Sequence, residues 1–456
     1  MSEATYSHSS FSIKWEHRDV CSSVKSWFCW SDVEEFSFRP IDKELNWPSG
    51  TYEALRYAFR LKLNRSVGWD VGSHPQSEAL TQAAAIYKRG VPLKGKETPI
   101  QSGTYQIEFI DTWNLDPDGF YIFDGKVAEA WGITDSENTL VIHLDEKNKN
   151  LTTVAKLLTA AFLKPVSKLN GWTFVGGGVL GDLGGFAATI AGHSFRFVPT
   201  TLLSMIDACI GGKTGVNFEE FGKNQIGSFA FPQKVVIAKQ WLKTLPTREF
   251  NAGLSEAFKH ALLSGNKRLA ESAAKARPDS SDFFPLIPEF VKVKSDIVSI
   301  DPIEQGLRAS LNLGHTLAHA IERLSHLNSE NPIHHGEAVG VGLLFCIKLS
   351  HSMGLLPLSP YRDMYDLLIN SNFLITPYSL AQYLNVQNLE SDELIKNILE
   401  GISLDKKNSF DQDSNWILLS DWGSLAQPSE SEFTIRVKNH EIQTCYFEFL
   451  REWKKH

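Results

Sequence analysis

The spacing of apolar residues changes along the chain and predicts two regions with different architecture. Up to about residue 245, stretches with the character of short β-strands alternate with stretches whose apolar residues recur at helical spacing. The strand-like stretches are 119–132, 139–145, 172–180 and 194–208, and the helical stretches are 150–163 and 181–192. Such alternation is typical of a parallel sheet with crossover helices. We therefore expect an α/β domain over residues 101–245.

Beyond Leu245 the pattern becomes mostly helical. Strand signals become sparse, and longer helical runs cover residues 249–265, 283–301, 310–324 and 336–354. We expect a mostly α-helical domain over 246–425, with the active cleft where it meets the carboxyl ends of the sheet. Residues 1–100 have weak periodicity and are expected to be an N-terminal extension of unknown fold, and the tail, 426–456, is expected to dock on the body.

Composition and charge narrow the classes of function. A chain of 456 residues is long enough for two or three domains. Its net charge of -8 and pI near 6.0 leave no basic stripe for a nucleic acid, so a small anionic ligand is the better expectation. The five cysteines are scattered without C-x-x-C spacing, which argues against a disulfide framework and favours the cytoplasm. No signal peptide and no membrane span are expected from the apolar runs.

Two glycine-rich stretches carry groups that could bind ligands. After Val175, three consecutive glycines form a turn that would let a pyrophosphate approach the backbone and the next helix. Farther on, lysines and amides stand among small residues and are expected to form a mobile loop suited to phosphate and hydroxyl groups. The polar residues of this second stretch are Asp207, Lys213, Asn217, Lys223 and Asn224. Taken alone, the first stretch could equally be a tight turn and the second a solvated loop.

The histidines give a stronger signal, because His315, His319, His334 and His335 lie within one short span of a chain that has 14 histidines. His315 and His319 are four apart in a helical pattern, so both project onto one face, where two imidazoles could ligate one divalent cation. The neighbouring candidates are His334, His335, Glu256 and Lys259. The combination favours a metal site, and spacing alone does not choose its three ligands.

The ordered motifs of the chain resemble those of the sugar phosphate cyclases, and among them the dehydroquinate synthase family. Matching blocks extend from about Tyr121 to Leu419 in the family's order. They are GGGVLGDLGGFAA, VPTTLLSMIDACIGGKTGVN, GKNQIGSF, LKTLPTREFNAGLSEAFKH, GLRASLNLGHTLAHAIE and HHGEAVGVG. The resemblance implies a Rossmann-like NAD-binding domain, then a helical metal-binding domain, in a cytoplasmic homodimer.

The resemblance also implies which residues bind the ligands. Zn²⁺, with Co²⁺ as an alternative, would be held by Glu256, His315 and His335, which leaves an open coordination position. The residues along NAD would be Asp124, Glu146, Lys149, Gly177, Gly178, Asp182, Thr200, Thr201, Lys223 and Thr244. The residues around an anionic heptulose phosphate would be Asp207, Lys213, Asn224, Lys259, Lys294, Arg308, Asn312, His319 and either Lys406 or Lys407. Arg308 and Lys294 together suit a carboxylate, because a guanidinium fork binds it bidentately and an ammonium adds charge.

The family's reaction belongs to the shikimate route to aromatic amino acids and is that of a carbon-oxygen lyase. It converts 3-deoxy-D-arabino-heptulosonate 7-phosphate to 3-dehydroquinate and phosphate, through transient oxidation by NAD, loss of phosphate, return of the hydride and aldol closure. The protein would contribute orientation and charge stabilisation.

Two departures from the family pattern leave other functions open. Ala191 stands where the family usually has an arginine that contacts phosphate, often from the partner subunit, and His193 or Arg196 could take over that contact. The stretch between His319 and His335 is also longer than usual. The alternatives are a related cyclase acting on sedoheptulose 7-phosphate or an amino analogue, a metal-dependent polyol dehydrogenase, and a non-catalytic paralogue.

Overall fold

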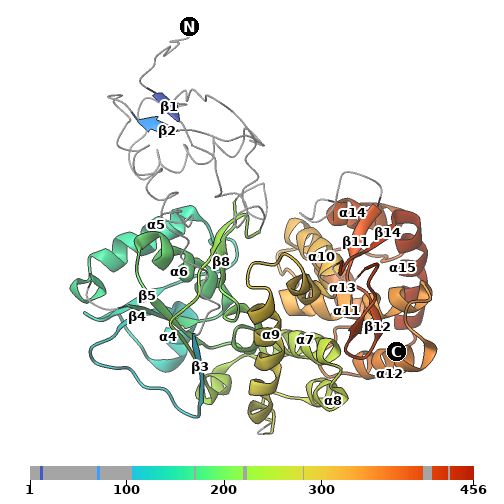
Figure 1. The fold of residues 1–456 in the computed structure, drawn as a ribbon, viewed down its shortest axis with the longest axis horizontal. Coiled ribbons are helices and arrows are strands. Elements are labelled where there is room, and N and C mark those ends of the chain that lie inside the picture. The colour runs from blue at the N-terminus through green and yellow to red at the C-terminus, as the bar shows by residue number, and fades with distance from the viewer. Residues whose placement is uncertain are drawn as a thin grey trace, which may run out of the picture. The chain divides into compact units, whose positions relative to one another are not determined.

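The computed structural model describes most of the chain from residue 105 onward (Figure 1). The described residues are 11–13, 69–71, 105–168, 171–218, 223–280, 282–403, 413–429 and 432–456. From residue 105 onward they divide into two compact units. The first contains residues up to Glu108, Asn114–Val198 and Gly212–Val236, and the second contains Phe109–Trp113, Pro199–Gly211 and Ile237–His456. The expected extension at 1–100 lies outside the described residues, apart from two short antiparallel strands, β1 (Phe11–Ile13) and β2 (Trp69–Val71).

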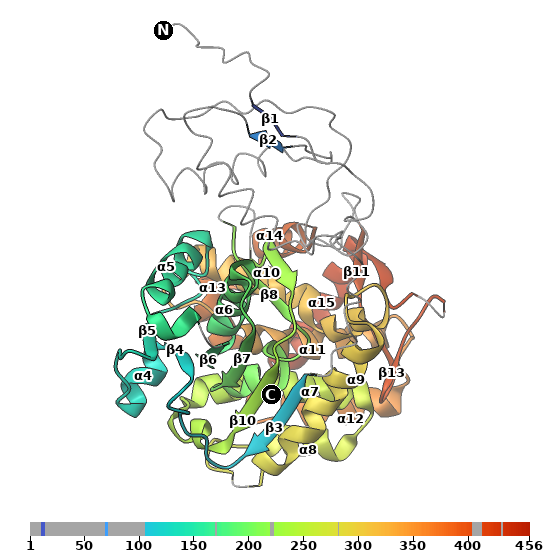
Figure 2. The same cartoon turned by 60° about the vertical axis from the view of Figure 1, so that its left-hand side comes forward.

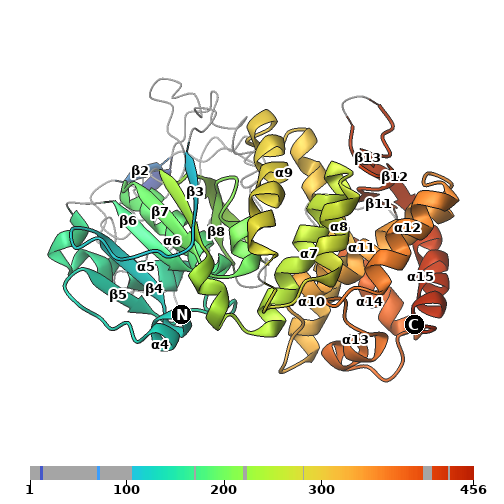
Figure 3. The ribbon, with the colours of Figure 1, turned by 90° about the horizontal axis from the view of Figure 1, so that it is seen from below.

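A six-stranded sheet forms the core of the first unit (Figure 3). Its strand order is β3 (Gln106–Ile110), β10 (Lys234–Ala238), β7 (Phe195–Pro199), β6 (Trp172–Gly176), β4 (Phe120–Asp124) and β5 (Thr139–Ile142). The pairs β4 with β5, β4 with β6, and β7 with β10 are parallel. All five residues of β6 are buried, as expected for an interior strand of a parallel sheet. The predicted α/β fold is confirmed, and the helices α5 (Leu151–Phe162) and α6 (Gly178–Ala191) match the predicted helical stretches.

The strand predicted over 119–132 is wrong in its second half. The chain is extended only to Asp124, and Gly125–Trp131 form the short helix α4. The Asp124 carboxylate caps this helix by accepting the backbone N–H two residues on, at 3.0 Å, and Gly132 ends it in the left-handed conformation. Seven residues are too few to display a helical repeat, so the two caps determine the structure here.

Helices form the second unit, and α11 (His335–Ser352) is buried at its centre (Figures 1 and 2). Residues 336–350 are all buried, because α11 contacts α7, α10, α12 and α15. The other helices are α7 (Thr247–Ser264), α8 (Lys267–Lys275), α9 (Ile287–Ile300), α10 (His315–Asn328), α12 (Leu358–Ile369), α13 (Pro377–Leu384), α14 (Asp392–Ser403) and α15 (Asn439–Trp453).

Two small antiparallel sheets accompany the helices of the second unit. The strand β11 (Asp413–Trp416) pairs with β14 (Ile435–Lys438), and β12 (Leu419–Asp421) pairs with β13 (Ser424–Leu425). The C-terminal helix α15 packs on α11, where the rings of Phe449 and Phe345 are 5.5 Å apart. Among the described residues, no helix has both the length and the apolar character needed to cross a membrane.

Two glycines allow α10 and α11 to approach each other closely. A Cβ at Gly342 would lie 2.0 Å from the carbonyl oxygen of Gly314. Gly314 itself has φ of +81°, and a Cβ there would lie 2.9 Å from the backbone nitrogen of Leu343. Because Gly314 directly precedes His315, this contact fixes the point at which α10 begins.

Replacing Gly314 by alanine should therefore destabilise the second unit more than the same change at Gly354. Both glycines have positive φ, so each change carries the cost of a left-handed L-residue, roughly 1–2 kcal/mol. A Cβ at Gly354 meets nothing within 4 Å, whereas one at Gly314 meets backbone, which adds about 1–3 kcal/mol. Urea unfolding followed by tryptophan fluorescence measures both losses, and equal losses would contradict the close approach of the two helices.

Candidate metal centre and cofactor-binding residues

Three predicted metal ligands, carried by three helices, meet in the second unit. Glu256 lies in the middle of α7, and His315 and His335 are the first residues of α10 and α11. The Nε2 atoms of both histidines are 3.4 Å from Glu256 Oε1, and the two ring centroids are 5.2 Å apart. The ligand atoms of the three residues lie within 4.8 Å of one another, so a single cation could contact them all.

Hydrogen bonds at the opposite edge of each ring orient the two imidazoles. His315 Nδ1 lies 3.1 Å from the carbonyl oxygen of Leu313, and His335 Nδ1 lies 3.0 Å from Glu322 Oε2. Because these oxygens only accept, each Nδ1 carries the hydrogen, and each Nε2 presents its lone pair toward Glu256 in the neutral ring. A carboxylate or carbonyl behind a histidine is the usual support of a metal ligand.

Charge around the three residues also suits a cation. Burial alone would raise the pKa of Glu256, but Lys259, with Nζ 2.5 Å from Oε2, and His315 lower it well below its usual value. Burial and Lys259 lower the pKa of His315 to about 4, so this ring is neutral at pH 7. Burial lowers the pKa of His335, but Glu322 and Glu256 outweigh it and raise the pKa to about 10. The carboxylates therefore attract positive charge to the position of the His335 ring.

The donor set fits zinc. One carboxylate and two imidazoles match the three protein ligands of a catalytic zinc site, which keeps one position open. Lys259 pairs with Oε2 of the buried Glu256, whereas Oε1 accepts no hydrogen bond of normal geometry from the described residues. A buried anionic oxygen in that position is the feature that a cation would satisfy.

His319, predicted to contact substrate, lies one turn along α10 from His315. The two rings are perpendicular, at 87°, with centroids 5.4 Å apart, and the centroid of His335 is 6.3 Å from that of His319. His319 therefore lies beside the three candidate metal ligands, where it could contact a molecule bound to the metal.

Asp207 forms ion pairs with two of the predicted anion-binding residues of the second unit. It lies in a π-helical turn, Ser204–Ala208, and its carboxylate is 2.9 Å from Lys294 Nζ and 3.6 Å from Lys259 Nζ. Burial would raise the pKa of Asp207, but the two lysines lower it well below its usual value. Burial lowers the pKa of Lys294, to which Lys259 and Arg308 add, although Asp207 opposes the change. Lys294 therefore lies close enough to Lys259 and Arg308 for their charges to act on it.

Asp207, Glu256 and His260 form a second close group of potential ligands. His260 Nε2 is 3.3 Å from Asp207 Oδ1, and its Nδ1 is 3.1 Å from the carbonyl oxygen of Phe290. The ammonium of Lys259 already pairs with both Glu256 and Asp207. We therefore assign the positive charge of this group to Lys259 rather than to a second metal ion.

Arg308 and Asn312 are held by their own loop. Arg308 is only 1% exposed. Its guanidinium donates to the carbonyl oxygens of Gly211, at 2.8 Å, and of Pro302. Asn312 Nδ2 donates to Glu304 Oε1 at 2.9 Å. With two carbonyls already bound to its guanidinium, Arg308 does not present the open bidentate fork that the sequence suggested for a substrate carboxylate.

In the first unit, three predicted cofactor contacts come together at the carboxyl ends of β4 and β6. Asp124 ends β4, Gly177 precedes α6 and Gly178 is its first residue. A Cβ at Gly176 would lie 2.9 Å from the Cβ of Asp124, so the two strand ends are in close contact. No described side chain caps α6, and its first N–H groups, which form no intrahelical bonds, suit a phosphate.

A buried lysine, Lys149, belongs to a network with three other predicted residues of the first unit. Lys149 Nζ donates to Asp182 Oδ2 at 2.5 Å and to Asn224 Oδ1 at 2.6 Å. The backbone N–H of Asn224 donates to Asn217 Oδ1 at 2.9 Å, and Asn217 Nδ2 donates to Glu146 Oε1 at 2.8 Å. Glu146, Lys149, Asp182 and Asn224 therefore belong to one network.

The stretch expected to be a mobile loop is partly an antiparallel hairpin. Strand β8 (Lys213–Val216) pairs with β9 (Ile226–Phe229), so that Lys213 lies opposite Phe229, while Lys223 is exposed in the connection. Small residues made this stretch resemble a loop, but they allow close pairing. A Cβ at Gly215 would lie 2.6 Å from the carbonyl oxygen of Ile226.

The remaining residues that were predicted to contact NAD or substrate belong neither to the Asp207 cluster nor to the Lys149 network. Thr200 is buried, Thr201 Oγ1 lies 2.8 Å from Ser204 Oγ, and Thr244 ends a short 3-10 helix; all three belong to the second unit. Lys406 and Lys407 lie outside the described residues. His193, considered as a substitute for the missing arginine, stacks on Trp172 with ring centroids 4.8 Å apart, and burial lowers its pKa.

Three polar residues of these groups were not assigned from the sequence, although their spacing carries a signal. His260 follows Glu256 by four residues and therefore lies on the same face of α7. Glu322 follows His315 by seven residues, or two turns of α10. Asn217 was noted as a polar loop residue, but its link to Glu146 spans 71 residues of sequence and has no local signature.

The stability of the loop that holds Arg308 should depend on pH, because the carboxylate of Asp301 organises that loop. Its carboxylate accepts the backbone N–H groups of Gln305, Gly306 and Arg308 at 2.7–3.0 Å. Burial would raise its pKa, but these donors lower it. A carboxyl group with a lowered pKa in the folded state stabilises the fold above its unfolded pKa, and this contribution is lost as the pH falls through the lowered value.

Replacing Asp301 by asparagine should therefore lower the unfolding free energy at pH 7 by roughly 1.5–3 kcal/mol, the contribution of a hydrogen bond to a charged group. The difference from the parent chain should shrink below about pH 4, where the carboxyl group becomes protonated. Urea unfolding at several pH values measures this, and a difference independent of pH would show that the charge of Asp301 is not what holds the loop.

Comparisons with known proteins agree in the family they indicate. The 3-dehydroquinate synthase N-terminal family matches residues 139–252, and the 3-dehydroquinate synthase C-terminal family matches residues 253–408. The 3-dehydroquinate synthase of Campylobacter concisus is 35% identical over 311 residues, which span 68% of this chain and 82% of that protein. That of a Picosynechococcus species is 39% identical over 271 residues, or 57% of this chain and 73% of that protein.

Solved structures share the fold. A 2-deoxy-scyllo-inosose synthase complexed with carbaglucose-6-phosphate, NAD⁺ and Co²⁺ matches with a TM-score of 0.58 and 26% identity, over 76% of this chain and 92% of that one. A 2-epi-5-epi-valiolone synthase from Streptomyces hygroscopicus subsp. jinggangensis, with NAD⁺ and Zn²⁺ bound, matches with a TM-score of 0.59 and 21% identity, over 78% of this chain and 99% of that one. The matches of the two family domains over residues 139–408 and the likeness to the Campylobacter concisus protein show that the chain belongs to the 3-dehydroquinate synthase family.

Proposed function

We propose that this chain is a 3-dehydroquinate synthase that converts 3-deoxy-D-arabino-heptulosonate 7-phosphate to 3-dehydroquinate and phosphate. The observation that carries the proposal is the convergence of Glu256, His315 and His335 in a member of this family. The same proposal makes the chain an NAD- and zinc-dependent lyase, with Co²⁺ as an alternative metal, that acts as a cytoplasmic homodimer.

Each of the two cofactors would supply a defined chemistry: NAD would take up and return a hydride, and the divalent metal would stabilise the negative charge of an ionising hydroxyl group. In the first unit, the N-terminus of α6 would bind the phosphates of the dinucleotide. Asp124, beside it, lies where a carboxylate could accept hydrogen bonds from ribose hydroxyls. Lys149 is held by Asp182 and Asn224 and would keep this region rigid.

In the second unit, the chain's own residues would orient an anionic sugar. Lys259 and Lys294 both pair with the carboxylate of Asp207, and Lys259 also pairs with Glu256, whose other oxygen faces the metal centre. Arg308 adds a third positive charge that acts on Lys294. With a divalent cation at Glu256, the positive charges of the group would outnumber its two carboxylates, so a phosphate or carboxylate of the substrate is a favourable partner. His319 would donate to, or accept from, a sugar oxygen next to the metal.

A related cyclase acting on sedoheptulose 7-phosphate or an amino analogue is the second candidate. It is supported by Ala191, which replaces the arginine usual in the family, and by the stacking of His193 on Trp172, which leaves that ring an unsuitable replacement. A chain that binds the phosphate without this arginine could accept a different heptulose phosphate.

Phosphate release should distinguish the candidates. The purified chain with NAD and Zn²⁺ should release phosphate from 3-deoxy-D-arabino-heptulosonate 7-phosphate at least about tenfold faster than from sedoheptulose 7-phosphate, since loss of a charged contact costs 1.4 kcal/mol or more. Colorimetric phosphate measurement gives both rates. The reverse preference would favour the related cyclase, whereas NADH accumulation with a simple polyol would identify a dehydrogenase, and no turnover with any of these compounds would favour a non-catalytic paralogue.

His335→Ala should remove both bound zinc and turnover. The change deletes one of three protein ligands, and the remaining carboxylate and single imidazole hold zinc poorly. Metal content by mass spectrometry and phosphate release test the two effects together. His440→Ala, an exposed histidine on α15, serves as the control and should change neither. Full activity of the His335 variant would refute the ligand assignment.

A further inference from the structure

We propose that Arg248 and Glu337 form a clamp that positions the metal ligand His335 and thereby sets how firmly the metal is retained. This inference rests on the proposed function, because it takes Glu256, His315 and His335 as the metal ligands. Arg248 and Glu337 themselves do not belong to that ligand set. They are positioning residues that act through the first turn of α11.

The clamp follows from the way α7 meets the start of α11. Arg248, Ala252 and Glu256 are spaced by four residues, so they lie on one face of α7. Each meets one of three consecutive α11 residues. Arg248 contacts Glu337, a Cβ at Gly336 would lie only 1.9 Å from the Ala252 carbonyl oxygen, and Glu256 Oε1 faces His335 Nε2 at 3.4 Å.

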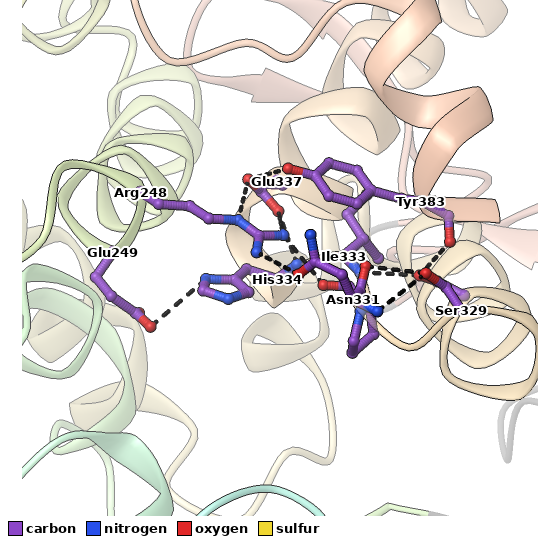
Figure 4. Close-up of polar contacts among 10 residues, drawn as sticks. Arg248, Glu249, Ser329, Asn331, Ile333, His334, Glu337 and Tyr383 are labelled. Atoms are coloured by element: carbon purple, nitrogen blue, oxygen red, sulfur yellow. Dashed lines mark hydrogen bonds and ion pairs between the residues drawn. The ribbon is translucent and has the colours of Figure 1, made fainter. Parts of the chain in front are cut away.

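The outermost of these three contacts is a two-point ion pair (Figure 4). Arg248 Nε donates to Glu337 Oε1 at 2.8 Å, and Nη2 donates to Oε2 at 2.7 Å. Glu337 is 6% exposed at its side chain and Arg248 30%, so water screens the pair only in part. Bidentate pairing fixes both direction and distance, because the planar guanidinium matches the carboxylate fork.

Glu337 passes this constraint to His335. Its Oε2 also accepts the backbone N–H of His334 at 2.8 Å, which completes a capping box at the start of α11. His335 lies between His334, whose backbone is tied to the carboxylate, and Glu337, which carries it. Since helix ends fray unless they are capped, the clamp holds the turn that aims the His335 ring at Glu256.

The same guanidinium also binds the connection between α10 and α11. Arg248 Nη1 donates to Asn331 Oδ1 at 3.1 Å, and Nη2 donates to the Pro332 carbonyl oxygen at 3.0 Å. The ring of Tyr383 lies 4.7 Å from the guanidinium carbon, and its hydroxyl lies 3.4 Å from Glu337 Oε1. The clamp therefore joins α7, the connection, α11 and α13.

The test compares zinc release from the zinc-loaded full-length chain and its variants into an excess of a chromogenic chelator. Arg248→Gln and Glu337→Gln should each speed release roughly 10–100-fold, the usual effect of losing a residue that orients a metal ligand. Arg248→Lys keeps the charge but not the fork, so it should release zinc at an intermediate rate. The matched control is Arg268→Gln, which breaks an exposed arginine–glutamate pair with Glu289 in the same unit and should not change the rate.

Three outcomes decide the inference. The double variant Arg248→Gln/Glu337→Gln should release zinc no faster than the faster single variant, because both changes break one unit. If the clamp variants only unfold at lower temperature, while the release rate measured far below that temperature stays that of the parent, the pair is merely structural and the inference is overturned. If Arg248→Gln does not fold, Arg248→Lys and Glu337→Gln decide by the same criterion.

This experiment separates the clamp from the function on which it rests. A parent chain that retains zinc and variants that release it at the parental rate would overturn the clamp alone. A parent chain that retains no zinc would overturn the metal assignment, and the clamp with it.

Discussion

The buried carboxylate of Glu256 is the constraint on which the second unit depends. The residue is 0% exposed, and an unpaired charge in that position would cost several kcal/mol. Lys259 compensates one oxygen, while the other faces the Nε2 atoms of two histidines that begin separate helices. A cation at that second oxygen would complete the compensation and join α7, α10 and α11 at one point. Glu256 therefore contributes both to the metal centre and to the packing of the three helices.

The same helix links this constraint to the recognition of an anion. Glu256 faces the metal centre, and Lys259, three residues on, turns toward Asp207 and the neighbouring Lys294. A metal ligand and an anion-binding group are thus held by one rigid element, which suits a reaction that must orient a charged sugar at a metal. At its other end, α7 carries Arg248, so the start of α11 is fixed by the helix that carries its metal partner.

Much of the fold follows from the spacing of apolar residues, whereas the site follows only in part. The strand within 172–180 was predicted because its apolar run is continuous up to a glycine turn, and the long helices because their repeats extend over enough residues. The helix 125–131 was missed because it is short and set by its caps. The spacing of His315 and His319 places two imidazoles on one helix face, yet it cannot show that the first of them faces Glu256.

Spacing alone did not choose between His334 and His335; the family resemblance chose His335, and the fold shows why. His334 is extended before the helix, with its ring 3.5 Å from Glu249, whereas His335 begins the helix and faces Glu256. Adjacent residues point in different directions at a helix start, and sequence does not reveal where that start lies to one residue. Links such as Glu322 to His335 and Asn217 to Glu146 are tertiary contacts, for which the local pattern carries no direct information. The central claim is tested most directly by a crystal structure of the zinc-loaded chain with data collected at the zinc absorption edge. The account predicts one anomalous peak about 2.0–2.2 Å from a Glu256 oxygen and from Nε2 of both His315 and His335, and a peak bound elsewhere, or through Nδ1, would contradict it.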